Sequence, residues 1–342
     1  MTEQRTFNAG IIDYNPTRMS ATEAKGLGIP PELQDHLADK RQYAPNIARH
    51  FPIGVSWFNP DHPWWVEAVM SNPAHVDYLK STDALILSGG GQSAYKFQER
   101  VPGAFTPEQR ETLEGSQEVT LSVLGSGKLV FSICLGGQLA INAVGGKIGR
   151  LPEGKSGVTP TEAGWLDHQL TDAGKKDEIF GSLPETFYAP HLHSDFVAEL
   201  PPLGQKVKTE HGTIAVVRTE ILATRNGYLY KGKLHNPDKQ YIHASLVEFD
   251  NGARLYQIQP HPEMATAKKA NFLVRQNQAW LEKDIGPEYF ATALAVPENA
   301  DFSVSQTITK FVELAKKRAQ ELNAVEFVAA NLSRAIEQYL IE

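Results

Sequence analysis

The sequence contains a single cysteine, Cys134, among its 342 residues. One cysteine cannot form a disulfide within the chain, and no second thiol is present to complete a cysteine-rich zinc site. This scarcity is typical of proteins in a reducing compartment, so we expect a cytoplasmic location. Cys134 is either a small buried core residue or a reactive thiol, and its surroundings must decide between the two.

The chain also lacks an excess of positive charge. Its 33 lysine and arginine residues are outnumbered by 40 aspartate and glutamate residues, which gives a net charge of −7, and no dense basic run is present. Such a run would be needed to neutralise a phosphate backbone, so we expect no nucleic-acid partner.

Long uninterrupted hydrophobic runs are absent as well. The least polar stretch, residues 129–146, is broken by Ser132, Gln138, Asn142 and several glycines, which a bilayer-spanning helix disfavours. The first residues show no basic segment followed by an apolar stretch, as a secretory signal would. We expect no membrane partner, and the 41% hydrophobic content is that of a globular protein.

The sequence does contain a series of short apolar runs separated by helix-like or loop-rich stretches. Such runs are typical of buried strands, and their alternation with helical segments indicates βαβ units. We therefore predict an α/β fold with an open, mostly parallel sheet flanked by helices. The predicted strands are Ala9–Asp13, Gly54–Phe58, Ala84–Leu87 and Leu129–Ile133.

The pattern becomes richer in strands after about Val158 and helical toward the C-terminus. The runs Tyr241–Phe249 and Ala253–Gln259 flank an Asp-Asn-Gly turn and predict a hairpin. We expect a helix from about Ala265 to Leu281 and two further helices after it. The apolar faces of those two helices contain Ile308, Phe311, Val312, Ala315, Ala319 and Leu322, and then Val325, Val328, Leu332 and Ile336.

These patterns predict one large domain and a helical extension. We expect the domain to cover residues 1–284, with insertions at about 17–41 and 212–241. Residues 285–342 would form the C-terminal helical extension.

Cys134 follows the apolar run Leu129–Ile133 and precedes Leu135-Gly-Gly-Gln138 and a helix-compatible stretch. This order predicts a sharp turn from a strand into a helix, and the two glycines permit a close approach of the backbone. A helix that begins beside the sulfur places its positive dipole and free N–H groups there, which favours a nucleophilic thiolate.

His261 and Glu263 lie in the segment Gln-Pro-His-Pro-Glu, directly after the predicted hairpin. Two prolines stiffen this segment and hold the histidine and the carboxylate in a fixed relation. Such a histidine can accept and return a proton, and the carboxylate can orient its ring.

A glycine-rich turn, residues 89–91, follows the predicted strand Ala84–Leu87. Its backbone N–H groups, together with that of Leu135, could stabilise an oxyanion. A phosphate-binding loop is the competing interpretation, but neither a following Lys-Ser/Thr pair nor GxGxxG spacing is present.

Taken together, SICLGGQLAINAVGGKI around Cys134, Gly-Trp at 164–165, HLHSDFV at 191–197 and QPHPE at 259–263 resemble the class I glutamine amidotransferases. The resemblance is strongest to the amidotransferase domain of GMP synthase and runs from about Ala84 to Glu263. It implies a flavodoxin-like α/β fold. It depends on the C-x-G-x-Q pattern followed at a distance by H-P-E.

The resemblance also implies a role for each matching residue. Cys134 would be the nucleophile, His261 the general base and acid, and Glu263 its orienting partner. The remaining implied roles are oxyanion N–H groups from Gly90 and Leu135, and contacts to the bound glutamine from Gln138 and from the backbone of Ser194 and Asp195.

The implied reaction hydrolyses the side-chain amide of glutamine through a γ-glutamyl thioester and releases ammonia. No metal or organic cofactor is expected for it. The chain has no room for a second, ATP-using synthetase domain, so the ammonia would pass to a separate synthetase partner. His191 and His193 form an H-x-H pattern, but no acidic or cysteine residues nearby match it as metal ligands, so we expect structural or substrate-shaping roles for them and no metal.

Two other functions remain open. A stand-alone γ-glutamyl hydrolase would share the cysteine, histidine and glutamate, and the unusual Gly91-Gln92 loop and long insertions would suit its bulkier substrates. A non-catalytic regulatory protein would retain the fold, although such proteins usually lose the nucleophile.

Overall fold

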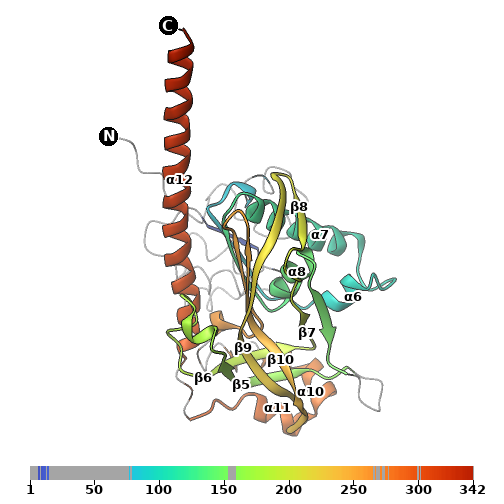
Figure 1. The fold of residues 1–342 in the computed structure, drawn as a ribbon. Helices are drawn as coiled ribbons and strands as arrows, with labels where there is room; N and C mark the ends of the chain where they lie inside the picture. The colour runs from blue at the N-terminus through green and yellow to red at the C-terminus, as the bar shows by residue number, and fades with distance from the viewer. Residues whose placement is uncertain are drawn as a thin grey trace, which may run out of the picture.

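The computed structural model describes most of the chain from residue 79 onward (Figure 1). The described residues are 7, 9–12, 14, 77, 79–152, 159–264, 266, 270–271, 274–275, 277–298, 300 and 302–341. At residue 108 and in residues 324–341, only the backbone is described. The expected insertion at 17–41 and the expected strand Gly54–Phe58 lie outside the described residues.

Four parallel strands form the centre of the fold, in the order β1 (Ala9–Ile12), β2 (Ala84–Leu87), β3 (Leu129–Ile133) and β11 (Arg254–Ile258). Every residue of the first three strands is buried. Their continuous apolar runs explain this, because a parallel strand covered on both faces needs apolar side chains along its whole length. The predicted α/β class with a parallel sheet is therefore confirmed.

Helices cover both faces of this parallel sheet. Neighbouring residues of β3 point to opposite faces. Phe131 thus belongs to a core shared with α12 (Gln306–Ile341), whereas Val130 belongs to a core shared with α7 (Pro107–Gly125) and α8 (Leu135–Ala143). Figure 1 shows α12 on one side of the molecule and α7 and α8 on the other. This layering is that of a flavodoxin-like open sheet.

A larger antiparallel region continues the sheet beyond β11. β10 (Lys233–Phe249) pairs antiparallel with β11, as the predicted hairpin requires, and Gly252 adopts a φ of 79° in the turn. β10 also pairs with β9 (Gly212–Tyr230), so much of the expected insertion at 212–241 forms a long second hairpin. The other strands of this region are β4 (Lys147–Arg150), β5 (Glu162–Leu170), β6 (Thr186–His193), β7 (Asp195–Glu199) and β8 (Lys206–Thr209).

The C-terminal region is helical, as predicted, but its helices differ from those expected. The prediction of two separate helices after Ile308 is wrong, because α12 is one helix of 36 residues. The two predicted helices meet at Asn323 and Ala324, and neither residue is a glycine or proline that would force a break. Of the predicted helix Ala265–Leu281, α10 forms the end, and the residues before it are only partly described. The remaining helices are α6 (Ala94–Gln98), α10 (Gln278–Ile285) and α11 (Pro287–Ala293), with short 3₁₀ turns at Gly174–Lys176, Pro262–Met264 and Ser303–Ser305.

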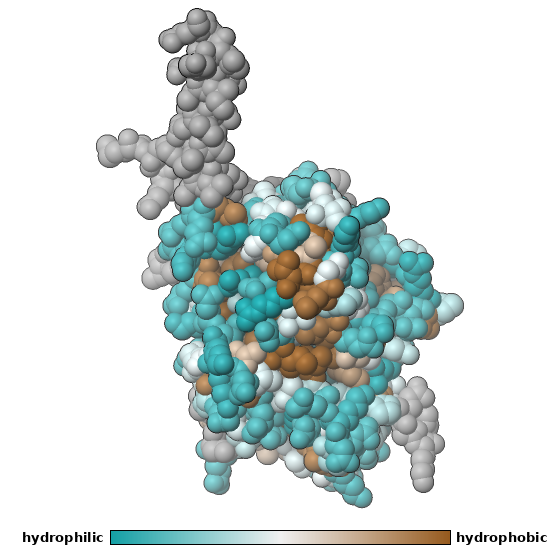
Figure 2. Space-filling view, viewed as in Figure 1, coloured by the Kyte–Doolittle hydropathy of each residue, from teal (hydrophilic) through white to brown (hydrophobic). Residues whose placement is uncertain are grey.

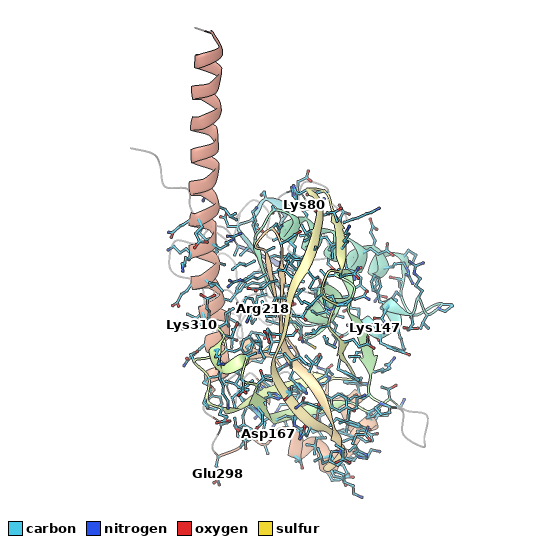
Figure 3. All side chains as sticks on the ribbon, viewed as in Figure 1. Lys80, Lys147, Asp167, Arg218, Glu298 and Lys310 are labelled. Carbon is cyan, nitrogen blue, oxygen red and sulfur yellow. The ribbon has the colours of Figure 1, made fainter. Side chains whose placement is uncertain are left out.

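The surface is predominantly polar. Figure 2 shows hydrophilic residues around the edge of the visible face and apolar residues gathered near its centre. In Figure 3, Lys80, Lys147 and Lys310 lie around the periphery of the view, and Arg218 lies nearer its centre. In the part of the chain that the structure describes, no helix is both long enough and apolar enough to cross a membrane.

Candidate active site

Cys134 lies at the junction of β3 and α8, as the sequence predicts. Its backbone has φ 50° and ψ −114°, a conformation that is uncommon for a residue with a side chain and marks a sharp, strained turn. Its N–H donates to the Ile258 carbonyl at 2.8 Å, which fixes the turn to β11. A Cβ at Gly136 would lie 2.6 Å from the Ser88 carbonyl oxygen, so only glycine permits this approach of α8 to the end of β2.

His261 and Glu263 lie directly beyond β11, beside this turn. His261 Nδ1 and Glu263 Oε1 are 2.7 Å apart, and both side chains are buried. The His261 N–H donates to the Pro190 carbonyl at 2.9 Å, which anchors the segment to β6. A Cβ at Gly89 would be 2.4 Å from His261 Cε1, so the glycine-rich turn packs directly against the imidazole.

Electrostatic interactions favour the protonated form of His261. Burial lowers the pKa of His261, but Glu263 and Cys134 raise it by more, so that its pKa shifts from 6.5 to about 10. His261 also makes side-chain hydrogen bonds to both residues. The arrangement therefore favours an imidazolium held between Glu263 and the nucleophile candidate Cys134.

A cavity of about 300 Å³ opens in front of Cys134 and His261. Of the eight residues predicted for the site, seven line this cavity, and Glu263 lies behind His261. The seven are Gly90, Cys134, Leu135, Gln138, Ser194, Asp195 and His261. Residues that are up to 171 positions apart in the chain are thus brought to one place by the ends of β2, β3, β6 and β11.

Gly90 and Leu135 are neighbours on the wall of the cavity beside Cys134. A Cβ at Gly90 would be 2.7 Å from Leu135 Cδ2, so the Gly90 backbone packs directly against the Leu135 side chain. Leu135 is the first residue of α8, and an N–H at that position has no acceptor within its own helix. This placement is compatible with the predicted oxyanion site.

The predicted substrate-contacting residues are held by bonds within the protein. Gln138 Nε2 donates to the Asp195 carbonyl at 2.7 Å and to Gln259 Oε1 at 3.1 Å. The Ser194 carbonyl accepts from the Leu151 N–H at 2.8 Å. Gln138 therefore positions the start of β7 at Asp195, in addition to lining the cavity.

Further cavity residues were not predicted from the sequence. Ser93 Oγ donates to Asp195 Oδ2 at 2.5 Å, and the Tyr95 N–H donates to the same oxygen at 3.1 Å. Arg150 Nε lies 3.6 Å from Asp195 Oδ1. A serine that precedes a short helix is a recognisable N-cap, but nothing in its sequence indicates the distant aspartate that it binds. Asn277 and the half-exposed Trp280 complete the rim.

The fold and the site define an α/β protein whose strand-to-helix cysteine faces a buried histidine–glutamate pair. Residues 64–223 match the sequence model of the family Glutamine amidotransferase class-I. Over these residues, which make up slightly less than half of the chain, the sequence is similar to the class I glutamine amidotransferase family, as its motifs predict. The matched range contains Cys134 and ends before His261 and Glu263. The comparison with curated proteins found no match.

Several solved structures are similar to this chain. A glutamine amidotransferase from Thermotoga maritima is 15% identical, with 91% of this chain and 99% of the other covered and a TM-score of 0.48. A protein from Thermoplasma acidophilum that is described as part of a GMP synthase is 12% identical, with 94% and 100% covered and a TM-score of 0.47. The glutaminase domain of CTPS from Trypanosoma brucei, with bound acivicin, is 13% identical, with 84% and 94% covered and a TM-score of 0.41. At these values the likenesses support no conclusion about substrate or partner.

Proposed function

We propose that this protein is a cysteine-dependent glutaminase that hydrolyses the side-chain amide of glutamine and supplies the ammonia to a separate synthetase. The observation that carries the proposal is the meeting of Cys134, His261 and Glu263 at one small cavity. The match of residues 64–223 to the amidotransferase family model supports the same reaction class.

In the first half-reaction, the Cys134 thiolate attacks the amide carbon of the glutamine side chain. The N–H groups of Gly90 and Leu135 stabilise the oxyanion of the tetrahedral intermediate. Protonated His261 gives its proton to the leaving nitrogen, the C–N bond breaks, and ammonia and a γ-glutamyl thioester result. Glu263 holds the imidazole ring in position and balances its charge.

In the second half-reaction, neutral His261 takes a proton from water, and the resulting hydroxide attacks the thioester carbon. The C–S bond breaks, glutamate leaves, and the thiolate and the imidazolium are restored. The net reaction converts glutamine and water to glutamate and ammonia, and none of its steps requires a metal or an organic cofactor.

The size of the cavity favours glutamine over a larger γ-glutamyl compound. About 300 Å³ is the small end of the range for ligand pockets and suits a single amino acid. Gln138 and the Ser194–Asp195 backbone are proposed to hold the amino-acid end of the substrate. A cytoplasmic location is proposed because the single cysteine suits a reducing compartment.

The test is to purify the full chain and its Cys134→Ala variant and to incubate each with glutamine and with a γ-glutamyl peptide. We expect the wild type to produce glutamate and ammonia from glutamine. The rate in the variant should be lower by a factor on the order of 10³ or more, because the nucleophile is removed. Faster cleavage of the peptide would favour the stand-alone γ-glutamyl hydrolase. Equal background rates in both proteins, with and without candidate synthetases, would favour the non-catalytic regulatory protein.

A further inference from the structure

A second group of titratable side chains lies behind the cavity, between β5, β6 and β10. It contains four histidines and one glutamate, and all five are at most 7% exposed. The members are Glu162, His168, His191, His193 and His243. Only His193 also lines the cavity, so the proposed glutaminase reaction uses none of the other four directly.

Three of these histidines converge on one point. His168 Nε2 and His191 Nε2 are 2.7 Å apart. The ring centroids are separated by 4.7 Å for His168 and His191, 4.8 Å for His168 and His243, and 5.2 Å for His191 and His243. One ring nitrogen from each of the three lies within 4.8 Å of the other two, which is a spacing that could hold a metal ion.

Several ring nitrogens of this group have no hydrogen-bond partner among the described residues. They are Nδ1 of His168, Nδ1 of His191 and both nitrogens of His243. An unsatisfied buried donor or acceptor is destabilising, so the protein bears a considerable cost to gather these rings. Ligation through Nε2 of His168, Nε2 of His191 and one nitrogen of His243 would give the His243 ring the partner that it lacks, because a neutral imidazole offers one lone pair.

Glu162 is better placed to support such a site than to bind its ion. Its Oε1 accepts from Arg225 Nη1 at 2.7 Å and from the Leu229 N–H at 2.6 Å, so its charge is already neutralised. Its Oε2 lies 3.3 Å from His193 Nε2. Arg225 continues to the exposed Asp167, which is labelled in Figure 3 on β5, so the guanidinium charge is shared by two carboxylates.

We propose that His168, His191 and His243 bind one divalent transition-metal ion, of which Zn²⁺ is the probe of choice. Three neutral imidazoles suit Zn²⁺, Co²⁺, Ni²⁺ or Cu²⁺, whereas Mg²⁺ and Ca²⁺ require oxygen ligands that this site does not offer. Binding replaces the hydrogen bond between His168 and His191 with two nitrogen–metal bonds of about 2.0–2.1 Å. His193 lies between the cavity and the site and marks the route of access.

The ion would stabilise the framework of the active site rather than take part in the chemistry. His243 lies on β10, and its carbonyl accepts from the Gln259 N–H at 2.7 Å. The neighbour of His191 on β6, Pro190, accepts from the His261 N–H at 2.9 Å. Joining β5, β6 and β10 at one ion therefore fixes the backbone to which the His261 segment is attached.

The test measures metal content in the full chain, purified without a histidine tag. The protein is treated with a chelator, incubated with excess Co²⁺ and desalted, and bound cobalt is then counted by mass spectrometry and by its visible absorption. We expect about one Co²⁺ per chain in the wild type, and a loss of at least about tenfold in His168→Gln and His243→Gln. The control is His211→Ala, which removes a half-exposed histidine outside the group and should retain the ion.

Thermal unfolding with and without Zn²⁺ provides the second readout. Zn²⁺ should raise Tm for the wild type and for His211→Ala, because it binds only the folded chain. If the wild type retains fewer than about 0.1 Co²⁺ per chain, the proposal is wrong. This outcome does not depend on whether the variants fold. Retention that depends on Glu162 and His193 but not on His168 and His243 also overturns it. Cys134→Ala should bind the ion normally, so loss of glutaminase activity and loss of the metal are distinguishable.

Discussion

At the scale of single residues, the site combines several costly features. Cys134 has a positive φ, and His261 and Glu263 are both buried. Strained backbone and buried charge each reduce stability unless surrounding contacts compensate. Here the compensation comes from the interactions of His261 with Glu263 and Cys134 and from backbone bonds to Ile258 and Pro190. This concentration of cost at one cavity is typical of a catalytic site.

Glu263→Gln should shift the pH dependence of glutamine hydrolysis. Among the groups that raise the pKa of His261 to about 10, Glu263 has the largest effect, so its loss lowers that pKa. We expect the alkaline limb of kcat to move to lower pH by about one to three units, because an opposite charge at this distance has an effect of that size. The control is Glu185→Gln, which alters an exposed carboxylate far from the cavity. An unchanged alkaline limb in Glu263→Gln would contradict the pairing.

The same pKa has a consequence for stability. The folded-state pKa of His261 lies above its ordinary value of 6.5, so the folded chain binds the proton more tightly than the unfolded chain. The resulting stabilisation is complete below about pH 6.5 and is lost as the pH rises toward 10. Urea unfolding should show a steeper decline over this range for the wild type than for Glu263→Gln.

The sequence predicts residues at motifs better than residues that meet only in space. Cys134, His261 and Gly90 are recognisable because strand, turn and proline signals surround them. The histidine group is not, because His168, His191 and His243 lie on three strands whose pairing the sequence does not reveal. The H-x-H pattern is the one available signal, and its further ligands come from distant strands.

At the scale of elements, the first half of α12 forms part of the hydrophobic core. Phe311 is fully buried, and its ring centroid lies 5.2 Å from that of Phe131 and 6.5 Å from that of Tyr256. Lys310, one residue earlier, is 42% exposed and lies on the solvent side (Figure 3). The helix therefore covers β3 and β11, the two strands that lead to Cys134 and to the His261 segment.

Phe311→Ala should destabilise the protein by about 3–5 kcal/mol, because it opens a cavity between α12 and the sheet. Lys316→Ala, on the exposed face of the same helix, should change the free energy of unfolding by less than about 0.5 kcal/mol. Urea unfolding followed by circular dichroism measures both. A small effect of Phe311→Ala would show that α12 is not packed as described.

Strands are predictable where apolar runs are continuous. The predicted bounds of Ala84–Leu87 and Leu129–Ile133 agree with the observed ones because every position is buried. The length of β9 and β10 escapes prediction, because half-exposed antiparallel strands contain many polar residues, as Asn236, Asp238 and Lys239 illustrate. The sequence does not predict that α12 is a single helix. The apolar side chains after Leu322 follow a different face from those before it, which suggests a break although no glycine or proline is present there.

At the scale of the whole molecule, the parallel strands supply the catalytic ends and the antiparallel region supplies the wall behind them. We propose residues 1–284 as the amidotransferase-like domain and residues 285–342 as a helical extension that packs on it through α12.

The most direct measurement uses a glutamine analogue with an electrophilic carbon in place of the side-chain amide. The full chain is incubated with it, and intact mass and peptide mapping locate any adduct. We predict one covalent adduct per chain, on Cys134, formed more slowly in an excess of glutamine and not formed in Cys134→Ala. A chain that stays unmodified, or an adduct elsewhere that glutamine does not suppress, would contradict the assignment of Cys134 as the nucleophile of a glutaminase.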